Sequence, residues 1–215
     1  MINLLFQGHA ILFLTILLAL VISLSCHEYG HAIVAKWNGD DTAQRAGRLT
    51  LNPLAHIDPM GLMMVVFVGF GYAKPVPTNP RNFTNMWADL LVAAAGPAMN
   101  LLLAVITINV YLLGRNMSVE LFFSDGAQTF FVILAQINLL LMLFNLVPIG
   151  ALDGHYILPY FLPRRLAQQY RYYNARYGNF VLLGLIIVSI MGVPILRTLF
   201  DLAQWILPLI ILPGL

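Results

Sequence analysis

The chain has 215 residues, of which 60% are hydrophobic and only 9% are charged, and its mean hydropathy is +0.82. Soluble domains carry about 25% charged residues, so the composition excludes an ordinary soluble protein and predicts an α-helical polytopic membrane protein. The formal net charge of +2 is too small to favour a nucleic acid as a partner, and the single cysteine, Cys26, excludes an intrachain disulfide framework.

Four regions of the sequence approach the length of about 20 apolar residues that a membrane-spanning helix needs. In chain order they are Phe6–Ala35, Trp87–Leu113, Phe130–Val147 and Phe180–Leu215. The last region is long enough for two helices, with a break near Gly192-Val193-Pro194. We therefore expect about five to six transmembrane helices.

One further apolar segment, Gly61–Gly71, is too short to cross a membrane. As a helix it would extend about 17 Å at about 1.5 Å per residue, whereas the hydrocarbon core is about 30 Å thick. Its glycines and β-branched valines favour a re-entrant loop or a β-hairpin. A strand edge at this place could pair with an extended peptide.

The basic residues indicate how the chain is oriented in the membrane. If Gly61–Gly71 does not cross, nine lysines and arginines lie on one side, and only Arg115 and Arg197 lie on the other. Cytoplasmic loops carry an excess of basic residues. The rich side is therefore expected to be cytoplasmic, with the N-terminus on the opposite side.

The sequence HEYGH, from His27 to His31, interrupts the first apolar region. Ionisable groups inside a membrane span are costly and usually functional. Residues four apart share one face of a helix, with Cβ atoms about 5–6 Å apart, so His27 and His31 could both bind one Zn²⁺. Glu28 points about 100° away from His27 and is placed to act as a general base on a water at the metal.

A catalytic zinc site needs three protein ligands and one open position. Four candidates for the third ligand are Asp153, His155, His56 and Asp58. Asp153 follows a helix that Pro148 interrupts, and glycines flank it on both sides. Unwound backbone at membrane depth is tolerated where it lines a cavity, and the expected topology brings Asp153 to the same side as His27. Asp153 is therefore the favoured third ligand. His56 and Asp58 are expected to have structural roles in a cytosolic loop, and His155 is expected to lie behind the ligands or to face the lipid headgroups.

These motifs resemble those of the site-2 protease family of intramembrane zinc metalloproteases. His27–His31 resembles the HExxH motif of that family, Gly96–Asn100 resembles its GxxxN motif, and Asn145–Gly154 resembles its NxxPxxxLDG motif. The likeness covers about Ser25–Gly154 and is to compact bacterial and archaeal members without a PDZ or CBS domain.

The resemblance implies a zinc metalloendopeptidase that cleaves peptide bonds in or near the transmembrane segments of membrane proteins. One Zn²⁺ per chain would be held by His27, His31 and Asp153, Glu28 would be catalytic, and Asn145 would bind substrate. The expected partners are a transmembrane protein substrate and the lipid bilayer.

The expected location is a prokaryotic cell membrane, crossed several times, with the active site toward the cytoplasmic side. Residues 1–215 are expected to form a single membrane-embedded metalloprotease domain, with its catalytic core at about 6–160 and C-terminal helices at about 180–215.

A metal-ion or proton transporter that uses the same His, Glu and Asp cluster is the alternative function. A transporter needs access from both membrane faces, but the ionisable groups of this sequence cluster at one depth. No second acidic series continues toward the outer face. That asymmetry favours the hydrolase.

Overall fold

The structure is a computed structural model and describes residues 1–69 and 71–215. Its regular elements are helices, and in this part of the chain no strand forms beyond an antiparallel bridge between Ile57 and Ala73. The four helices that are long and apolar enough to cross a membrane are α2 (Ala10–Trp37), α5 (Ala88–Asn116), α6 (Asp125–Asn145) and a continuous helical segment, Arg164–Ile190. The predicted count of five to six is not confirmed, because α10 (Ile195–Ile206) has only 12 residues.

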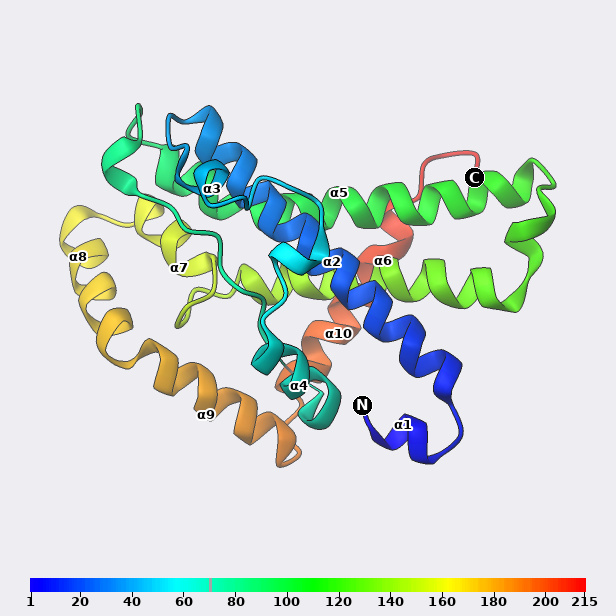
Figure 1. Ribbon diagram of the computed structural model, residues 1–215. Helices are drawn as coiled ribbons and strands as arrows, with labels where there is room; N and C mark the ends of the chain where they lie inside the picture. The colour runs from blue at the N-terminus through cyan, green and yellow to red at the C-terminus, as the bar shows by residue number, and fades with distance from the viewer. Residues whose placement is uncertain (70) are drawn as a thin grey trace.

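The centre of the molecule is a bundle of α2, α5 and α6, in which α6 runs back along α5 and α2 crosses both (Figure 1). The crossing of α2 and α5 is close because Gly30 has no side chain. A Cβ at Gly30 would lie 2.5 Å from Met99 Cγ and 2.8 Å from the Ala95 carbonyl oxygen. Small residues of this kind let membrane helices approach closely, so the bundle brings residues of α2 against α5.

The segment predicted as a re-entrant loop or β-hairpin, Gly61–Gly71, is mostly helical. Helix α4 spans Pro59–Val68, so the β-hairpin prediction is wrong for this stretch; Phe70 lies outside the described residues. Asp58 caps α4 by accepting hydrogen bonds from two N–H groups of its first turn, both at 2.9 Å, and Gly69 ends the helix with φ +90°. These start and stop signals outweigh the strand propensity of the valines.

The two ends of this segment return to the same place. The bridge between Ile57 and Ala73 joins the chain before and after α4. A Cβ at Gly61 would lie 2.0 Å from the Tyr72 carbonyl oxygen, so the chain comes back directly against the helix. The two ends of the segment thus lie on the same side of α4, and that the segment does not cross the membrane stays a prediction. Because the N–H groups inside α4 are used within the helix, they form no strand edge for an extended peptide.

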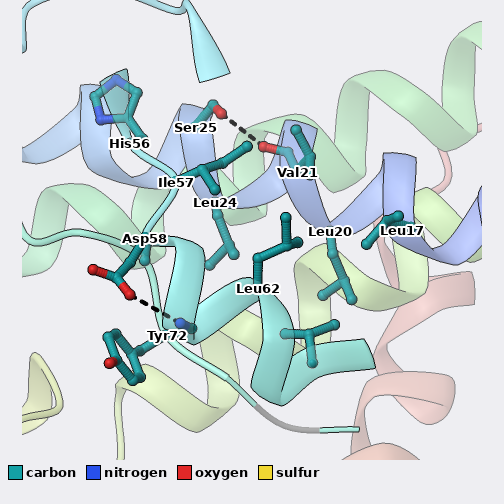
Figure 2. A pocket seen from close by; sticks show the side chains of 13 residues that line it. Leu17, Leu20, Val21, Leu24, Ser25, His56, Ile57, Asp58, Leu62 and Tyr72 are labelled. Atoms are coloured by element: carbon teal, nitrogen blue, oxygen red, sulfur yellow. Dashed lines mark hydrogen bonds between the residues drawn. The ribbon is translucent and has the colours of Figure 1, made fainter. Parts of the chain in front are cut away.

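A small apolar pocket lies between α2 and α4 (Figure 2). Its apolar lining includes Leu17, Leu20, Val21 and Leu24 from α2 and Leu62 and Val65 from α4. The lining contains neither His27, His31 nor Asp153. This pocket is therefore a packing gap between two helices and is separate from the predicted metal site.

After α6 the chain turns and enters a long helical arc, yellow to orange in Figure 1. The arc is built from α8 (Arg164–Tyr173), the π-helical turn η5 (Asn174–Gly178) and α9 (Asn179–Ile190). The predicted break near Gly192 is confirmed, because α10 begins only at Ile195. Ala203 of α10 packs into the buried cluster that Leu139 of α6 and Ala104 of α5 form.

Short helical turns complete the chain. They are α1 (Asn3–Phe6), α3 (Thr42–Arg45), η1 (Pro53–Ala55), η2 (Pro80–Asn82), η3 (Glu120–Phe123), α7 (Gly154–Ile157), η4 (Leu158–Phe161) and η6 (Leu207–Ile210). The loop between α6 and α7 carries Asp153, which stands at the N-terminal boundary of α7. The predicted ligands thus come from one long helix and from one loop.

Candidate metal centre

His27, His31 and Asp153 converge in the bundle. The Nε2 atoms of the two histidines are 3.0 Å apart. Asp153 Oδ2 lies 3.2 Å from Nε2 of His27, and Asp153 Oδ1 lies 3.4 Å from Nε2 of His31. One ligand atom from each residue lies within 4.8 Å of the other two. Among the described residues, these three form the group of His, Cys, Asp and Glu side chains that could hold one metal ion.

The hydrogen bonds behind the two imidazoles leave both Nε2 atoms as acceptors. His27 Nδ1 lies 2.6 Å from Asn100 Oδ1, and His31 Nδ1 lies 2.7 Å from the Val92 carbonyl oxygen. Both partners can only accept, so each neutral ring carries its proton on Nδ1. Two nitrogen lone pairs and a carboxylate therefore face one another in a buried place, and a cation relieves their repulsion.

The donor set also fits zinc chemically. Asp153 Oδ2 is buried and accepts no hydrogen bond in the described structure. Two imidazole nitrogens and one carboxylate oxygen form a ligand set found in catalytic zinc sites. Metal-binding histidines usually donate their other ring N–H to an oxygen acceptor, as His27 and His31 do here. The residues present therefore fit Zn²⁺.

Asn100 is held in one orientation by a buried chain of polar side chains. Its Nδ2 donates to the Ser23 carbonyl at 3.2 Å and to Asn138 Oδ1 at 2.8 Å, which leaves Oδ1 for His27. Asn138 Nδ2 donates in turn to Ser23 Oγ at 2.8 Å. All three residues of this chain are fully buried. They belong to α2, α5 and α6, so this hydrogen-bond network fixes the imidazole of His27 relative to all three helices.

We expect Asn100→Ala to weaken zinc binding about 10–100-fold, the usual effect of removing a hydrogen-bond partner of a metal ligand. The matched control is Asn109→Ala. Asn109 is also buried in α5, but its side chain binds the Val105 and Ile210 carbonyls, far along the helix. Competition with a chromophoric zinc chelator measures both affinities. If Asn100→Ala binds zinc as tightly as Asn109→Ala, the hydrogen bond from His27 to Asn100 does not contribute to zinc affinity.

Gly96 makes room for the two imidazoles. A Cβ at this position would lie 2.4 Å from His31 Nε2 and 2.6 Å from His27 Nε2. The GxxxN pattern thus has a physical meaning, because Gly96 leaves space for both rings and Asn100, one turn later, binds one of them. Sequence reasoning recognised the pattern and missed these two roles. The available signal was a glycine and an asparagine four residues apart in an apolar helix.

Glu28 lies beside His27 and is bound by the backbone of a distant segment. Its Oε2 accepts a hydrogen bond from the Val76 N–H at 2.9 Å, and its side chain is buried. Pro75 and Pro77 flank Val76 and have no N–H. Val76 is therefore the donor that this extended stretch offers to the carboxylate.

Asp40 fixes the segment that carries Val76. It is fully buried and accepts hydrogen bonds from the Asn79 N–H at 2.7 Å, the Thr42 hydroxyl at 2.5 Å and the Asn82 amide at 2.8 Å. Burial alone would raise the pKa of the Asp40 carboxyl, but these hydrogen bonds outweigh it and lower the pKa below its usual value. An ionised Asp40 thus ties the segment to the end of α2. Sequence reasoning did not single out this residue.

The other residues considered from the sequence lie outside the group of three. His56 Nε2 bonds to the Thr50 carbonyl at 2.7 Å, and Asp58 caps α4, so both have structural roles as predicted. The ring of His155 bonds to a carbonyl of its own turn at 3.0 Å. Asn145 donates to a carbonyl of its own helix at 2.9 Å, and its contact with substrate stays a prediction.

A pair of histidines four residues apart on an apolar helix, with an adjacent glutamate and a converging aspartate, defines a membrane-embedded metalloprotease of the HExxH class. The chain belongs to peptidase family M50, the site-2 protease family, whose model matches residues 15–123 and 116–186. The resemblance seen in the sequence is thereby confirmed.

Similar proteins from bacteria agree with this assignment. YwhC of Bacillus subtilis (strain 168), which its name describes as a zinc metalloprotease, is 44% identical over 151 residues, which are 69% of each chain. Rip2 of Mycolicibacterium smegmatis, described in the same way, is 32% identical over 207 residues, which are 90% of this chain and 73% of Rip2. Rip2 of Mycobacterium tuberculosis is 30% identical over 156 residues, 69% of this chain and 57% of that protein. No solved structure matches the chain.

The family assignment and the apolar helices make this chain a multi-pass integral membrane protein and a zinc metalloprotease. The match reaches residue 186, well beyond Gly154, where the motifs recognised in the sequence end. The expected extent of the likeness was therefore too short. Helix α8, the turn η5 and much of α9 also belong to the family region.

Proposed function

We propose that this protein is an intramembrane zinc metalloendopeptidase that cleaves peptide bonds in or near transmembrane segments of other membrane proteins. The observation that carries the proposal is that Asp153 converges on His27 and His31, which lie with Glu28 in a helix long and apolar enough to cross a membrane. Membership of peptidase family M50 supports the hydrolytic activity and the use of zinc.

In this proposal each side chain has one task. His27, His31 and Asp153 would hold one Zn²⁺ per chain. The bound ion supplies Lewis acidity, which lowers the pKa of water to about 7 and polarises a peptide carbonyl. Glu28 takes a proton on its carboxylate and returns it to the leaving amine. Asn145, the last residue of α6 and eight residues before Asp153, would hold the substrate backbone.

The location and the domain organisation are proposed from the same features. The site would open toward the cytoplasmic side of a prokaryotic cell membrane, because the segments that follow His31 and Asp153 carry most of the basic residues. Residues 1–215 would act as one metalloprotease domain, with a catalytic core at about 6–160 and C-terminal helices at about 180–215. The packing of α10 against α6 supports a single unit. The transporter alternative is not favoured, since the relatives are named as proteases.

The test uses purified protein in liposomes with a reporter that contains one transmembrane segment. We expect about one zinc per chain in the wild type and cleavage of the reporter within or next to that segment. A chelator should stop cleavage, and added zinc should restore it. Asp153→Ala should lower zinc occupancy and cleavage together, because one of three ligands is lost.

The matched control is Asp201→Ala, which removes an exposed carboxylate on α10. This variant should keep wild-type zinc content and activity. Full zinc retention in Asp153→Ala would remove Asp153 from the ligand set. Zinc flux across the liposome membrane without any cleavage would instead support the transporter.

A further inference from the structure

Two side chains from α8 and η5 bind the backbone of the loop that carries Asp153, between α6 and α7. The Gly150 N–H donates to Asn174 Oδ1 at 2.8 Å, and the Gly150 carbonyl accepts from Asn174 Nδ2 at 2.9 Å. The Tyr170 hydroxyl donates to the Pro148 carbonyl at 2.8 Å. Tyr170 and Asn174 are four residues apart and so lie on one helix face. Together they bind both ends of the loop 148–150, just before Asp153.

This loop needs partners from elsewhere because its backbone is no longer helical. Helix α6 ends at Asn145, and Pro148 cannot continue its hydrogen-bond pattern. Gly150 is buried and has φ +65°, a left-handed conformation that suits glycine. Polar backbone groups at membrane depth must be satisfied inside the protein. The amide of Asn174 satisfies both groups of Gly150, in the way that a neighbouring strand would.

The helix that carries Asn174 is itself adapted to this contact. Residues Asn174–Gly178 form a π-helical turn inside an otherwise α-helical segment. A Cβ at Gly178 would lie 2.3 Å from Asn174 Oδ1 and 2.9 Å from the Gly150 nitrogen, so any side chain there would displace the pair. Single π-helical turns are rare and often occur at functional sites. The π-helical turn and the absence of a side chain at Gly178 both make room for the two hydrogen bonds between Asn174 and Gly150.

The position of Asp153 depends on the path of this loop, whereas the positions of His27 and His31 are fixed by a long helix. His27 and His31 stand on a helix of 28 residues, whereas Asp153 stands at the N-terminal boundary of the four-residue helix α7. A Cβ at Gly154 would lie 2.2 Å from the Leu146 carbonyl oxygen, so the loop folds back tightly on the end of α6. The carboxylate can meet the imidazoles only while the loop keeps this path.

We propose that Tyr170 and Asn174 are positioning residues for the metal centre: by holding the loop 148–150, they place Asp153 against His27 and His31. The inference rests on the proposed ligand set and extends it to a part of the chain that carries no recognised motif. Neither residue belongs to the group of His27, His31 and Asp153 that could hold the ion. Without them the loop must be ordered when the metal binds, and the entropy of that ordering lowers metal affinity.

The test measures zinc affinity by chelator competition and the visible absorption spectrum of the cobalt(II)-loaded protein, which reports the number and arrangement of ligands. Asn174→Ala removes both hydrogen bonds to Gly150 and should weaken zinc binding at least about tenfold, the size of the entropy cost of ordering about one backbone residue. Tyr170→Phe removes one bond and keeps the ring, so it should weaken binding less. Both variants should alter the cobalt spectrum.

Each variant has a matched control in the same helical segment. Tyr173→Phe removes a hydroxyl from an exposed tyrosine that makes only ring contacts in the described structure. Asn179→Ala removes an amide that lies near Gly150 without a hydrogen bond to it. Both controls should bind zinc and cobalt like the wild type.

The inference is overturned if Asn174→Ala and Tyr170→Phe keep wild-type affinity and an unchanged cobalt spectrum. It is also overturned if the controls lose as much affinity as the test variants, since the effect would then belong to the helix as a whole. Asp153→Ala separates this result from a failure of the proposed ligand set. If Asp153→Ala binds zinc normally, the ligand set itself is wrong.

Discussion

Glu28→Gln is expected to keep its zinc and lose at least about 99% of its cleavage rate. A positioned general base usually contributes about 10²–10⁴-fold to a reaction rate, and the amide of glutamine cannot take the proton. The size of the side chain is nearly unchanged. Its amide oxygen can still accept the hydrogen bond from the Val76 N–H that Glu28 accepts at 2.9 Å, so the segment around Val76 should keep its place.

The measurement compares single-turnover cleavage of the transmembrane reporter with zinc content determined on the same preparation. Glu120→Gln is the matched control, because Glu120 lies on the exposed turn η3, outside the metal group. It should cleave at the wild-type rate. A Glu28→Gln protein with near-normal turnover would contradict the role of Glu28 as the base.

Gly96→Ala is expected to abolish tight zinc binding, and activity with it. The added methyl would lie 2.4 Å from His31 Nε2 and 2.6 Å from His27 Nε2, the two atoms that face the metal position. Real Cβ contacts are not this short, so at least one imidazole must leave its place. The loss of affinity should exceed the roughly 10–100-fold that follows removal of an outer hydrogen-bond partner, because the ligands themselves are displaced.

Gly184→Ala is the control for this substitution. Gly184 lies in α9, and a Cβ there would meet no atom within 4 Å. Alanine is favoured over glycine in a helix by about 0.5–1 kcal/mol, so this variant should fold at least as well as the wild type and keep its zinc. Normal zinc affinity in Gly96→Ala would mean that the two rings do not approach α5 as the structure describes.

The sequence was sufficient for the three candidate ligands because each is marked by a local pattern. His27 and His31 stand at helical spacing in an apolar helix, and Asp153 follows the proline and glycine that come after the end of α6. The partners behind them are marked less clearly, because the GxxxN pattern that contains Asn100 does not say which side chain Asn100 binds. Asn138 is one of several polar residues in α6, and its pairing with Asn100 depends on how α5 and α6 rotate toward α2. That rotation is set by the packing of the whole bundle, so the sequence alone does not predict it.

Two other features could not be read from composition. Helix α4 was mistaken for a loop or hairpin because the valines were weighed and the caps at Asp58 and Gly69 were not. The role of Asn174 was invisible, because a π-helical turn has no sequence signature and its partner, Gly150, lies 24 residues earlier in the chain. The first case was a local signal that the sequence already held, whereas the second depends on tertiary structure.

The order of the candidate ligands in the sequence affects the protein during its synthesis and membrane insertion. Asp153 follows His31 by 122 residues, which a ribosome adds in roughly 6–24 s at about 5–20 residues per second. During that interval the nascent chain holds both histidines and Glu28 but not the third proposed ligand. Tyr170 and Asn174 are added later still. If the proposed ligand set holds, the protease should therefore be inactive until Asp153 has been added, while newly made membrane segments pass beside it.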